Sequence, residues 1–358
     1  MSHLDGMTYA PQGKPSAVCQ PGDFPFAASH LDHGHIYGQC NGLIEAGGTL
    51  KLVYDPDPSK VKAFCGTYPQ VKPANSFDHI LDDASIKLLA AAAVPSERGP
   101  LGCRVMNSGK DYFTDKTPFT SLDQLQKARD IAGRTGRKYM VYYSERLHVE
   151  CAVLAGQLIE QGAIGRVFQT VGSGPHRLNA ASRPAWFFER ARYGGVLCDI
   201  GSHQTEQFLF FTGARDARVN HSAIANLNHA QHPELEDFGE ASLTADNGAS
   251  GYYRVDWFTP NGLRSWGDGR TFIFGTQGTI ELRKYVELAA ANPEGDQLYL
   301  VDEAGEHRIS CAGKVGYPFF GQLILDCLNR TENAMTQDHA FKAAELCLTA
   351  QAQAVRLR

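Results

Sequence analysis

Paired cysteines, long apolar runs and a strong net charge are all missing from this sequence. Its nine cysteines are scattered over 358 residues without a Cys-x-x-Cys pair, which excludes a disulfide framework and a thiolate zinc site. No stretch approaches 18 apolar residues, and no basic flank precedes an apolar run at the start, so we expect a cytoplasmic protein without a membrane partner. A net charge of −5 argues against a nucleic-acid partner, which selects a basic face.

What is present suits a globular chain with a sizeable core. Hydrophobic residues make up 43% and charged residues 20% of the sequence, and the length suits two domains. The first residues are rich in Pro, Gly and Ser and predict a loose arm. We expect an N-terminal arm over residues 1–22, a first domain over 23–147 and a second domain over 148–358.

Strand-like and helix-like segments alternate through the first domain. An apolar run at 24–31 precedes a helical stretch at 36–46, which Gly47 and Gly48 close, and a strand at 50–54 follows. Further predicted strands lie at 72–74, 88–94, 112–113 and 139–143. This rhythm predicts a doubly wound parallel sheet of the Rossmann type, with helices between the strands.

The pattern changes after about residue 150. Helices are predicted at 149–161 and 199–211 and a helical region at 319–355, whereas residues 251–257 alternate with the period of a half-buried strand. Strand-like runs lie at 217–225, 240–245, 250–258, 271–274, 279–282 and 297–301. The second domain is therefore predicted to be α+β, with a large, mainly antiparallel open sheet.

The first strand–turn–helix segment has features of a dinucleotide site. Such a site needs a glycine turn at a helix start and an acid about 20 residues later for the ribose hydroxyls, and Asp55 lies 21 residues after Gly34. Asp32 and Tyr37 stand where the first and third glycines of the usual pattern would be. Asp55 would repel a 2′-phosphate, which predicts NAD rather than NADP. The expected cofactor contacts are Asp32, Gly34, His35, Ile36, Asp55, Val94, Pro95, Ser96 and Lys116.

The same segment permits a metal-site interpretation. His30, Asp32, His33 and His35 form a dense run of possible ligands, but such a site needs further ligands from later loops. No matching His/Asp cluster is obvious downstream, so we expect no metal. A metal-dependent hydrolase using the His30–His35 run stays an alternative, as do plain loop histidines.

Two later segments carry groups suited to proton transfer. Lys116 follows a predicted strand, at the edge of the sheet where ligands of such folds bind. Asp199 and His203 are four residues apart, so on a helix they share a face and the acid can orient the imidazole.

Taken in order, these segments resemble the glucose–fructose oxidoreductase/inositol dehydrogenase (Gfo/Idh/MocA) family. Asp115-Lys116 before Pro118 resembles the family's Glu-Lys-Pro, and Gly194-Gly195 with Asp199 and His203 resembles its GGxxxDxGxH helix. Residues 135–146, 162–165 and 275–278 resemble further family motifs. The likeness extends over about residues 24–355, with departures at the glycine turn, at Asp115 and at the displaced proline.

The resemblance implies an enzyme that moves a hydride between NAD(P) and a hydroxyl carbon of a sugar, sugar acid or cyclic polyol. It assigns the base to His203, with Lys116 near the reacting oxygen and Asp199 in support. Expected substrate residues are Tyr143, His176, Arg177, Trp186 and His203. Since residues 172–193 are rich in arginine, a pocket wall there would favour a carboxylated or phosphorylated sugar, whereas a solvated loop or subunit contact is an equal reading.

Other interpretations stay open. They are a redox-neutral glycosidase of the same family that uses NAD transiently, and a binding protein without catalysis. The resemblance also implies a homodimer or homotetramer formed through the C-terminal sheet.

Overall fold

The computed structural model describes residues 5–288 and 295–357, and the chain divides into two units. The parallel-sheet unit comprises Met7–Tyr142 and Tyr317–Phe341. The mixed-sheet unit comprises Tyr143–Gly316, Lys342–Arg358 and the start of the chain up to Gly6. The expected boundary was residue 147, whereas the first stretch of the parallel-sheet unit ends at Tyr142 and the chain returns to that unit at Tyr317.

Six strands form the parallel sheet in the order β3-β2-β1-β4-β5-β6. The strands are β1 (Pro25–Ser29), β2 (Thr49–Tyr54), β3 (Lys72–Pro73), β4 (Leu88–Ala91), β5 (Asp111–Asp115) and β6 (Tyr139–Tyr142). This is the order of dinucleotide-binding Rossmann sheets, in which ligands bind where the order reverses, here between β1 and β4. The predicted doubly wound sheet is confirmed.

Helices connect these strands and complete the unit. They are α1 (His35–Glu45), α2 (Pro58–Thr67), α3 (Phe77–Asp82), α4 (Pro95–Asn107), α5 (Leu122–Thr135) and α11 (Pro318–Asn329). The α11 helix belongs here because its Phe320 ring packs against α1, where a Cβ on Gly42 would lie 2.4 Å from that ring. Phe320 also meets the ring of Tyr142 on β6, so α11 contributes to the core of the parallel-sheet unit.

The expectation of a loose N-terminal arm is wrong for residues 7–18. The segment continues from η1 (Gly6–Thr8) along α1, where the Gly13 N–H donates to the Glu45 carboxylate at 2.9 Å. The Val18 N–H donates to the Ala46 carbonyl at 3.0 Å. Backbone hydrogen bonds thus hold a segment whose composition alone suggests a loop.

The mixed-sheet unit is built on nine strands in the order β14-β13-β12-β11-β7-β10-β9-β8-β15. Neighbours are antiparallel except for the pairs β7–β10 and β8–β15. The strands are β7 (Val167–Pro175), β8 (Ala217–Ala225), β9 (Phe238–Ala245), β10 (Ser250–Asp256), β11 (Arg270–Gly275), β12 (Gly278–Arg283), β13 (Gln297–Asp302), β14 (Gly305–Ser310) and β15 (Val355–Arg356). The prediction of a large, mainly antiparallel sheet is confirmed.

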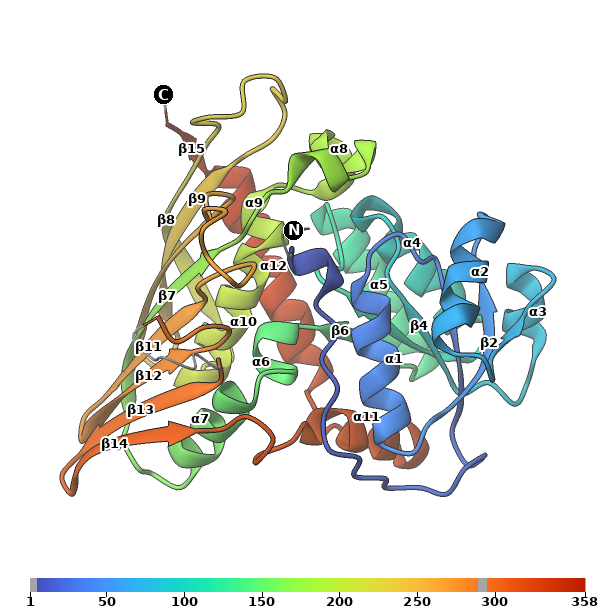
Figure 1. The fold of residues 1–358 in the computed structure, drawn as a ribbon, viewed down its shortest axis with the longest axis horizontal. Coiled ribbons are helices and arrows are strands. Elements are labelled where there is room, and N and C mark those ends of the chain that lie inside the picture. The colour runs from blue at the N-terminus through green and yellow to red at the C-terminus, as the bar shows by residue number, and fades with distance from the viewer. Residues whose placement is uncertain (1–4, 289–294, 358) are drawn as a thin grey trace. The chain divides into compact units, whose positions relative to one another are not determined.

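Helices pack against one face of this sheet (Figure 1). The helices of the unit are α6 (Ser144–Leu147), α7 (Glu150–Glu160), η2 (Ala180–Ser182), η3 (Ala185–Phe188), α8 (Arg190–Tyr193), α9 (Val196–Asp199), α10 (Gly201–Thr212) and most of α12 (Gln337–Gln353). The helical region expected at 319–355 is thus broken between α11 and α12. No helix among the described residues is long and apolar enough to cross a membrane.

Candidate active site

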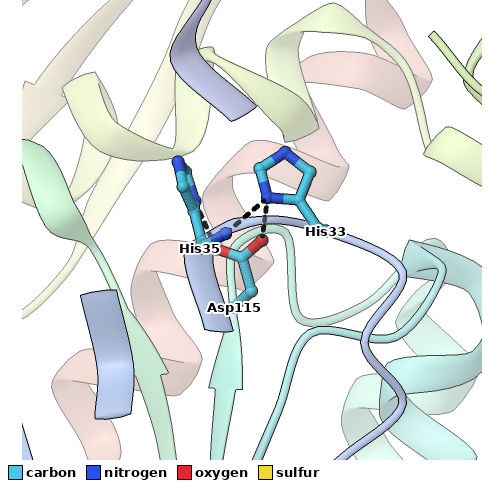
Figure 2. Close-up of side chains that lie close together, drawn as sticks. All are labelled: His33, His35 and Asp115. Atoms are coloured by element: carbon cyan, nitrogen blue, oxygen red, sulfur yellow. Dashed lines mark hydrogen bonds and ion pairs between the residues drawn. The ribbon is translucent and has the colours of Figure 1, made fainter. Parts of the chain in front are cut away.

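In the parallel-sheet unit, three side chains meet at the carboxyl ends of β1 and β5. Asp115 is the last residue of β5, and its carboxylate contacts the imidazoles of His33 and His35 at the start of α1 (Figure 2). The Asp115 oxygens lie 2.9 Å from His35 Nδ1 and 3.2 Å from His33 Nδ1. All three side chains are buried, so the group is a fixed polar cluster.

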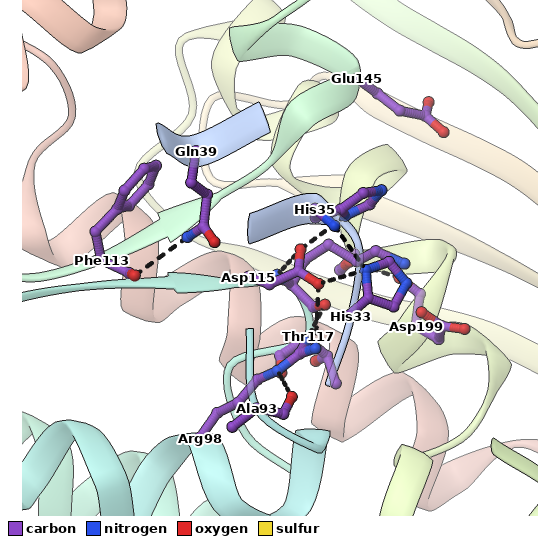
Figure 3. Close-up of polar contacts among 12 residues, drawn as sticks. His33, His35, Gln39, Ala93, Arg98, Phe113, Asp115, Thr117, Glu145 and Asp199 are labelled. Atoms are coloured by element: carbon purple, nitrogen blue, oxygen red, sulfur yellow. Dashed lines mark hydrogen bonds and ion pairs between the residues drawn. The ribbon is translucent and has the colours of Figure 1, made fainter. Parts of the chain in front are cut away.

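A buried arginine completes this cluster (Figure 3). Arg98 of α4 lies 3.1 Å from Asp115 Oδ2, donates to the Ala93 carbonyl at 2.6 Å and also donates to the Lys116 carbonyl. Burial would raise the pKa of Asp115, but the two histidines and Arg98 hold it well below its ordinary value. Burial, reinforced by the neighbouring cations, lowers the pKa of His33 well below its usual range. Asp115 is therefore ionised and His33 neutral at neutral pH.

The cluster contains a third possible metal ligand that the sequence did not reveal, but its charges do not favour a metal ion. Asp115 supplies the later ligand that the sequence did not reveal, and one ligand atom from each of His33, His35 and Asp115 lies within 4.8 Å of the others. His30 takes no part, because its ring packs against Phe77 at 5.1 Å. The carboxylate already carries the Arg98 guanidinium, and a dication at the same oxygen atoms would be repelled by it.

The expected ribose-binding acid lies where the sequence predicted it. Asp55 directly follows β2 and is 6% exposed, and its two oxygens accept from the N–H groups of Leu31 and Asp57 at 2.6 and 2.8 Å. Asp32 instead forms an ion pair with Lys60 at 2.6 Å. Each carboxylate oxygen of Asp55 has a second lone pair for a ribose hydroxyl, so sheet order and acid together fit a dinucleotide.

Gly34 precedes α1 as its N-cap, and the structure gives it a further role. A Cβ there would lie 2.1 Å from the Met7 carbonyl oxygen. The close approach that the glycine permits is therefore made by the N-terminal segment. His35 and Ile36 begin the helix behind it, while Val94 is the N-cap of α4, followed by Pro95 and Ser96.

We predict that Gly34→Ala will disturb both this contact and the helix start. The added methyl meets backbone, which cannot rotate away, so a loss of about 1–3 kcal/mol is expected from overpacking, together with weaker NAD binding. Chemical denaturation and NAD titration measure the two effects. Gly66→Ala in α2 is the control, since a Cβ there meets nothing within 4 Å; equal behaviour of the two variants would contradict the prediction.

The mixed-sheet unit holds a second buried cluster, centred on Glu145 of α6. Lys284, which follows β12, donates to Glu145 Oε2 at 2.8 Å, and the Gln204 amide of α10 donates to the same oxygen at 3.0 Å. The Lys284 side chain is 0% exposed. This ion pair therefore lies entirely inside the unit.

Two histidines lie near the same carboxylate. His176 Nε2 is 3.9 Å from Glu145 Oε1, and its ring centroid lies 4.5 Å from that of Trp266. Burial would raise the pKa of Glu145, but Lys284, His203 and His176, in falling order, lower it to about 2. The ionised Glu145 carboxylate therefore interacts electrostatically with His203, the predicted base.

Asp199 ends α9 and His203 lies in the first turn of α10. Ile200 between the two helices is itself helical, with φ −75° and ψ −39°. The predicted spacing of acid and imidazole on one helical path therefore holds. Asp199 is half-buried, whereas His203 is 2% exposed.

The expected arginine-rich pocket wall has a structural role in the described contacts. Arg177 donates to the carbonyls of Pro260 and Leu263 at 2.9 and 2.6 Å. Arg183 donates to the Leu178 carbonyl at 2.8 Å and lies over the Phe187 ring. Trp186 packs beside Phe187, and Tyr143 is fully buried with its pKa raised well above the ordinary value by burial.

Sequence reasoning missed Glu145 and Lys284. Each is a charged residue two positions after a predicted strand, at 139–143 and 279–282, and polar residues near strand ends are candidates for ligand contacts. Their separation of 139 residues hides the pairing, which only the fold reveals.

Comparison with known proteins decides the family. The model of the GFO/IDH/MocA C-terminal domain matches residues 153–281. A provisionally assigned oxidoreductase of Erwinia carotovora atroseptica, solved as a crystal structure, is 49% identical and superposes with a TM-score of 0.90, covering 94% of this chain and 100% of that one. The chain belongs to the Gfo/Idh/MocA family. The resemblance drawn from the motifs is confirmed.

Two curated proteins that the chain resembles are dehydrogenases. A D-xylose dehydrogenase of Paenarthrobacter nicotinovorans is 21% identical over 243 residues, 64% of this chain and 61% of that protein. The scyllo-inositol 2-dehydrogenase (NAD(+)) of Bacillus subtilis strain 168 is 25% identical over 252 residues, 68% of this chain and 69% of that protein. The matched region therefore spans less than two thirds of the first relative.

Proposed function

We propose that this Gfo/Idh/MocA protein is an NAD-dependent dehydrogenase of a sugar or cyclic polyol. The observation that carries the proposal is the buried His203 beside an ionised carboxylate, in a chain whose other unit has the Rossmann strand order. The relatives, a xylose and an inositol dehydrogenase, support the substrate class. Asp55 and the residues at the start of α1 would hold NAD, which would supply the hydride-accepting group.

The roles of the protein side chains follow from their chemistry. His203 receives the proton of the substrate hydroxyl, and the Lys116 ammonium stabilises the negative charge that develops on the substrate oxygen. Asp199 orients the imidazole or the hydroxyl. We propose that His176 contacts the substrate. The contacts of Arg177, Trp186 and Tyr143 within the unit instead support a structural role for these three residues.

The test of this proposal is a change in absorbance at 340 nm with NAD and a panel of sugars and polyols. Turnover of one member supports a dehydrogenase. NAD retained through purification, with sugar-bond cleavage but no net change in NAD, would replace it by the redox-neutral glycosidase. If neither NAD nor any sugar or polyol of the panel changes activity or melting temperature, a non-catalytic protein that binds another class of ligand would be favoured.

NAD should bind more tightly than NADP, by about tenfold or more, which corresponds to about 1.4 kcal/mol. The Asp55 carboxylate accepts from a ribose 2′-OH and repels a 2′-phosphate. Lys60 lies 4.0 Å from Asp55, but Asp32 at 2.6 Å already offsets its charge. Calorimetry on both cofactors measures the ratio. Asp55→Asn should reduce it, whereas the exposed helix cap Asp57→Asn should leave it unchanged, since Asn caps as well as Asp.

A metal should be dispensable. The Arg98 guanidinium already pairs with Asp115 Oδ2 at 3.1 Å and would repel a divalent ion there, so chelation should leave turnover and melting temperature unchanged. Metal analysis of the freshly purified protein is the direct measurement. One equivalent of zinc or manganese would contradict this and revive the hydrolase alternative with His33, His35 and Asp115 as ligands.

We also propose a homodimer or homotetramer formed through the helix-free face of the nine-stranded sheet. Gly172 of β7 faces α10, so Val171 faces the opposite side, and the register places Tyr252 and Phe272 beside Val171. Tyr252 is 39% exposed and Val301, on the same face, is 47% exposed. Measurement of the molar mass in solution tests this assembly.

A further inference from the structure

The carboxylate of Glu145 is satisfied on one side only. Its Oε2 atom receives hydrogen bonds from Lys284 and Gln204 at 2.8 and 3.0 Å. Its Oε1 atom is buried and has no hydrogen-bond donor among the described residues, since His176 Nε2 is 3.9 Å away. One oxygen is thus held in place while the other lacks a donor.

A buried acceptor without a donor costs free energy, and native structures rarely keep one without a reason. The Lys284 ammonium keeps Glu145 ionised, so Oε1 can accept a hydrogen bond but cannot donate one. His176 Nε2 lies 3.9 Å from this oxygen, with the Trp266 ring against the imidazole, and the proposed base His203 interacts electrostatically with the same carboxylate. A hydroxyl donor beside an aromatic surface is what a sugar or cyclic polyol offers.

The same geometry is unsuited to an anionic ligand. A carboxylate or phosphate within reach of Oε1 would bring two negative charges together, and one of them would have to take up a proton. Of the nearby arginines, Arg177 donates from one terminal nitrogen to the carbonyls of Pro260 and Leu263, and Arg183 donates to the Leu178 carbonyl. The Lys284 ammonium lies on the opposite oxygen of Glu145.

We propose that Glu145 Oε1 accepts a hydrogen bond from a substrate hydroxyl and that the site therefore takes an uncharged sugar or polyol rather than a sugar acid or sugar phosphate. This inference rests on the proposed function and narrows its substrate class. Glu145 is a substrate-binding residue in this assignment, while Lys284 and Gln204 fix its orientation.

The experiment compares neutral sugars with their acids in the full-length protein with NAD. Matched pairs are glucose with glucuronate and xylose with xylonate, supplemented by inositol, and both turnover and calorimetric binding are measured. The wild-type protein should favour the neutral member at least ~10-fold in kcat/KM. Glu145→Gln should lower kcat/KM for the neutral member by ~10- to 150-fold, chiefly through KM, and reduce the preference.

Two further variants keep the result interpretable. Glu145→Gln leaves the Lys284 ammonium buried without its partner, which destabilises a fold, so the double variant Glu145→Gln/Lys284→Met removes both charges and should show the same reduced preference. Asp237→Asn is the control for loss of a buried carboxylate, because Asp237 binds the 227–229 loop. It should lower stability and leave the preference unchanged.

The possible results distinguish a failure of the Glu145 assignment from a failure of the dehydrogenase proposal. If the protein turns over or binds these ligands but prefers the acids, or if both Glu145 variants keep the wild-type preference, Glu145 Oε1 holds only water and the inference is wrong. If the wild-type protein neither binds nor turns over any neutral or acidic member, the dehydrogenase proposal is wrong and the inference falls with it.

Discussion

Replacement of His203 by alanine should lower kcat by roughly 10²- to 10⁴-fold at saturating NAD and substrate, because that is the usual contribution of a general base. NAD affinity should change little, since His203 belongs to the mixed-sheet unit. Lys116→Ala should cause a loss of similar size and also weaken NAD, because Lys116 follows β5 at the carboxyl edge of the parallel sheet. Steady-state kinetics and NAD titration measure both effects.

The two losses should not add in the double variant, because groups that act on one proton transfer behave as a unit. Asp199→Asn should be milder and should shift the pH–rate profile, since an amide no longer stabilises a protonated imidazole. The exposed His79 on α3 and Lys127 on α5 provide matched alanine controls, expected to keep full turnover.

Near-normal turnover of His203→Ala would overturn the assignment of the base. His176 and His148, both buried, would then be tested in the same way. Tyr143 is the weaker candidate, because burial raises its pKa well above the ordinary value and a phenol so placed has little tendency to lose its proton at neutral pH.

The parallel sheet could be predicted because its local signals agree with its long-range structure. The strands β4 and β6 are short apolar runs between helices, and Ser76 and Ser121 cap α3 and α5 by accepting from the N–H groups of His79 and Gln124. The return of the chain as α11 had no such local signal. It depends on Phe320 filling the space that Gly42 leaves on α1.

The central strand β7 of the mixed sheet could not be predicted. Its second half, residues 172–175, is Gly-Ser-Gly-Pro, and because glycine and proline are depleted in strands these residues suggest a loop. The structure explains the composition, since a Cβ on Gly172 would lie 2.2 Å from Gln204 Oε1. The glycine that weakens the strand pattern lets α10, with Gln204 and His203, lie close to the sheet.

The site was predictable only where a motif marks it. Asp199, His203 and Lys116 stand in recognisable patterns, and the structure places His203 beside Glu145, which no pattern marks. The arginines at 177 and 183 form hydrogen bonds with backbone carbonyls, and composition alone cannot distinguish such a guanidinium from one that faces a ligand. Contacts between distant segments decide such cases.

Removal of the Arg98 side chain should produce the largest loss of stability among the changes considered. Arg98→Met leaves Asp115 buried without its guanidinium and leaves the carbonyls of Ala93 and Lys116 without their donor. Breaking a buried ion pair from one side costs about 3–5 kcal/mol. Urea denaturation at pH 7 measures the free energy of unfolding.

Arg104→Met is the matched control, because Arg104 lies on the same helix and pairs with Asp78 while 54% exposed. Exposed pairs contribute about 0–1 kcal/mol, so this variant should unfold almost like the wild type. A loss as large for Arg104→Met as for Arg98→Met would show that the effect arises from α4 and not from the buried pair.

The pH dependence identifies the carboxylate that is responsible. The folded pKa of Asp115 is well below the ordinary value, so its ionised form stabilises the wild-type protein above a pH of about 4, the unfolded pKa of Asp being ~3.9, and this contribution is lost as the pH falls through the folded pKa. Without Arg98 that pKa rises, and the protonated acid needs no cation. The difference in free energy of unfolding between Arg98→Met and the wild type should therefore decrease as the pH is lowered. Asp115→Asn in the Arg98→Met background should restore part of the stability at pH 7. A difference that stays constant with pH would assign the loss to the carbonyls of Ala93 and Lys116 instead.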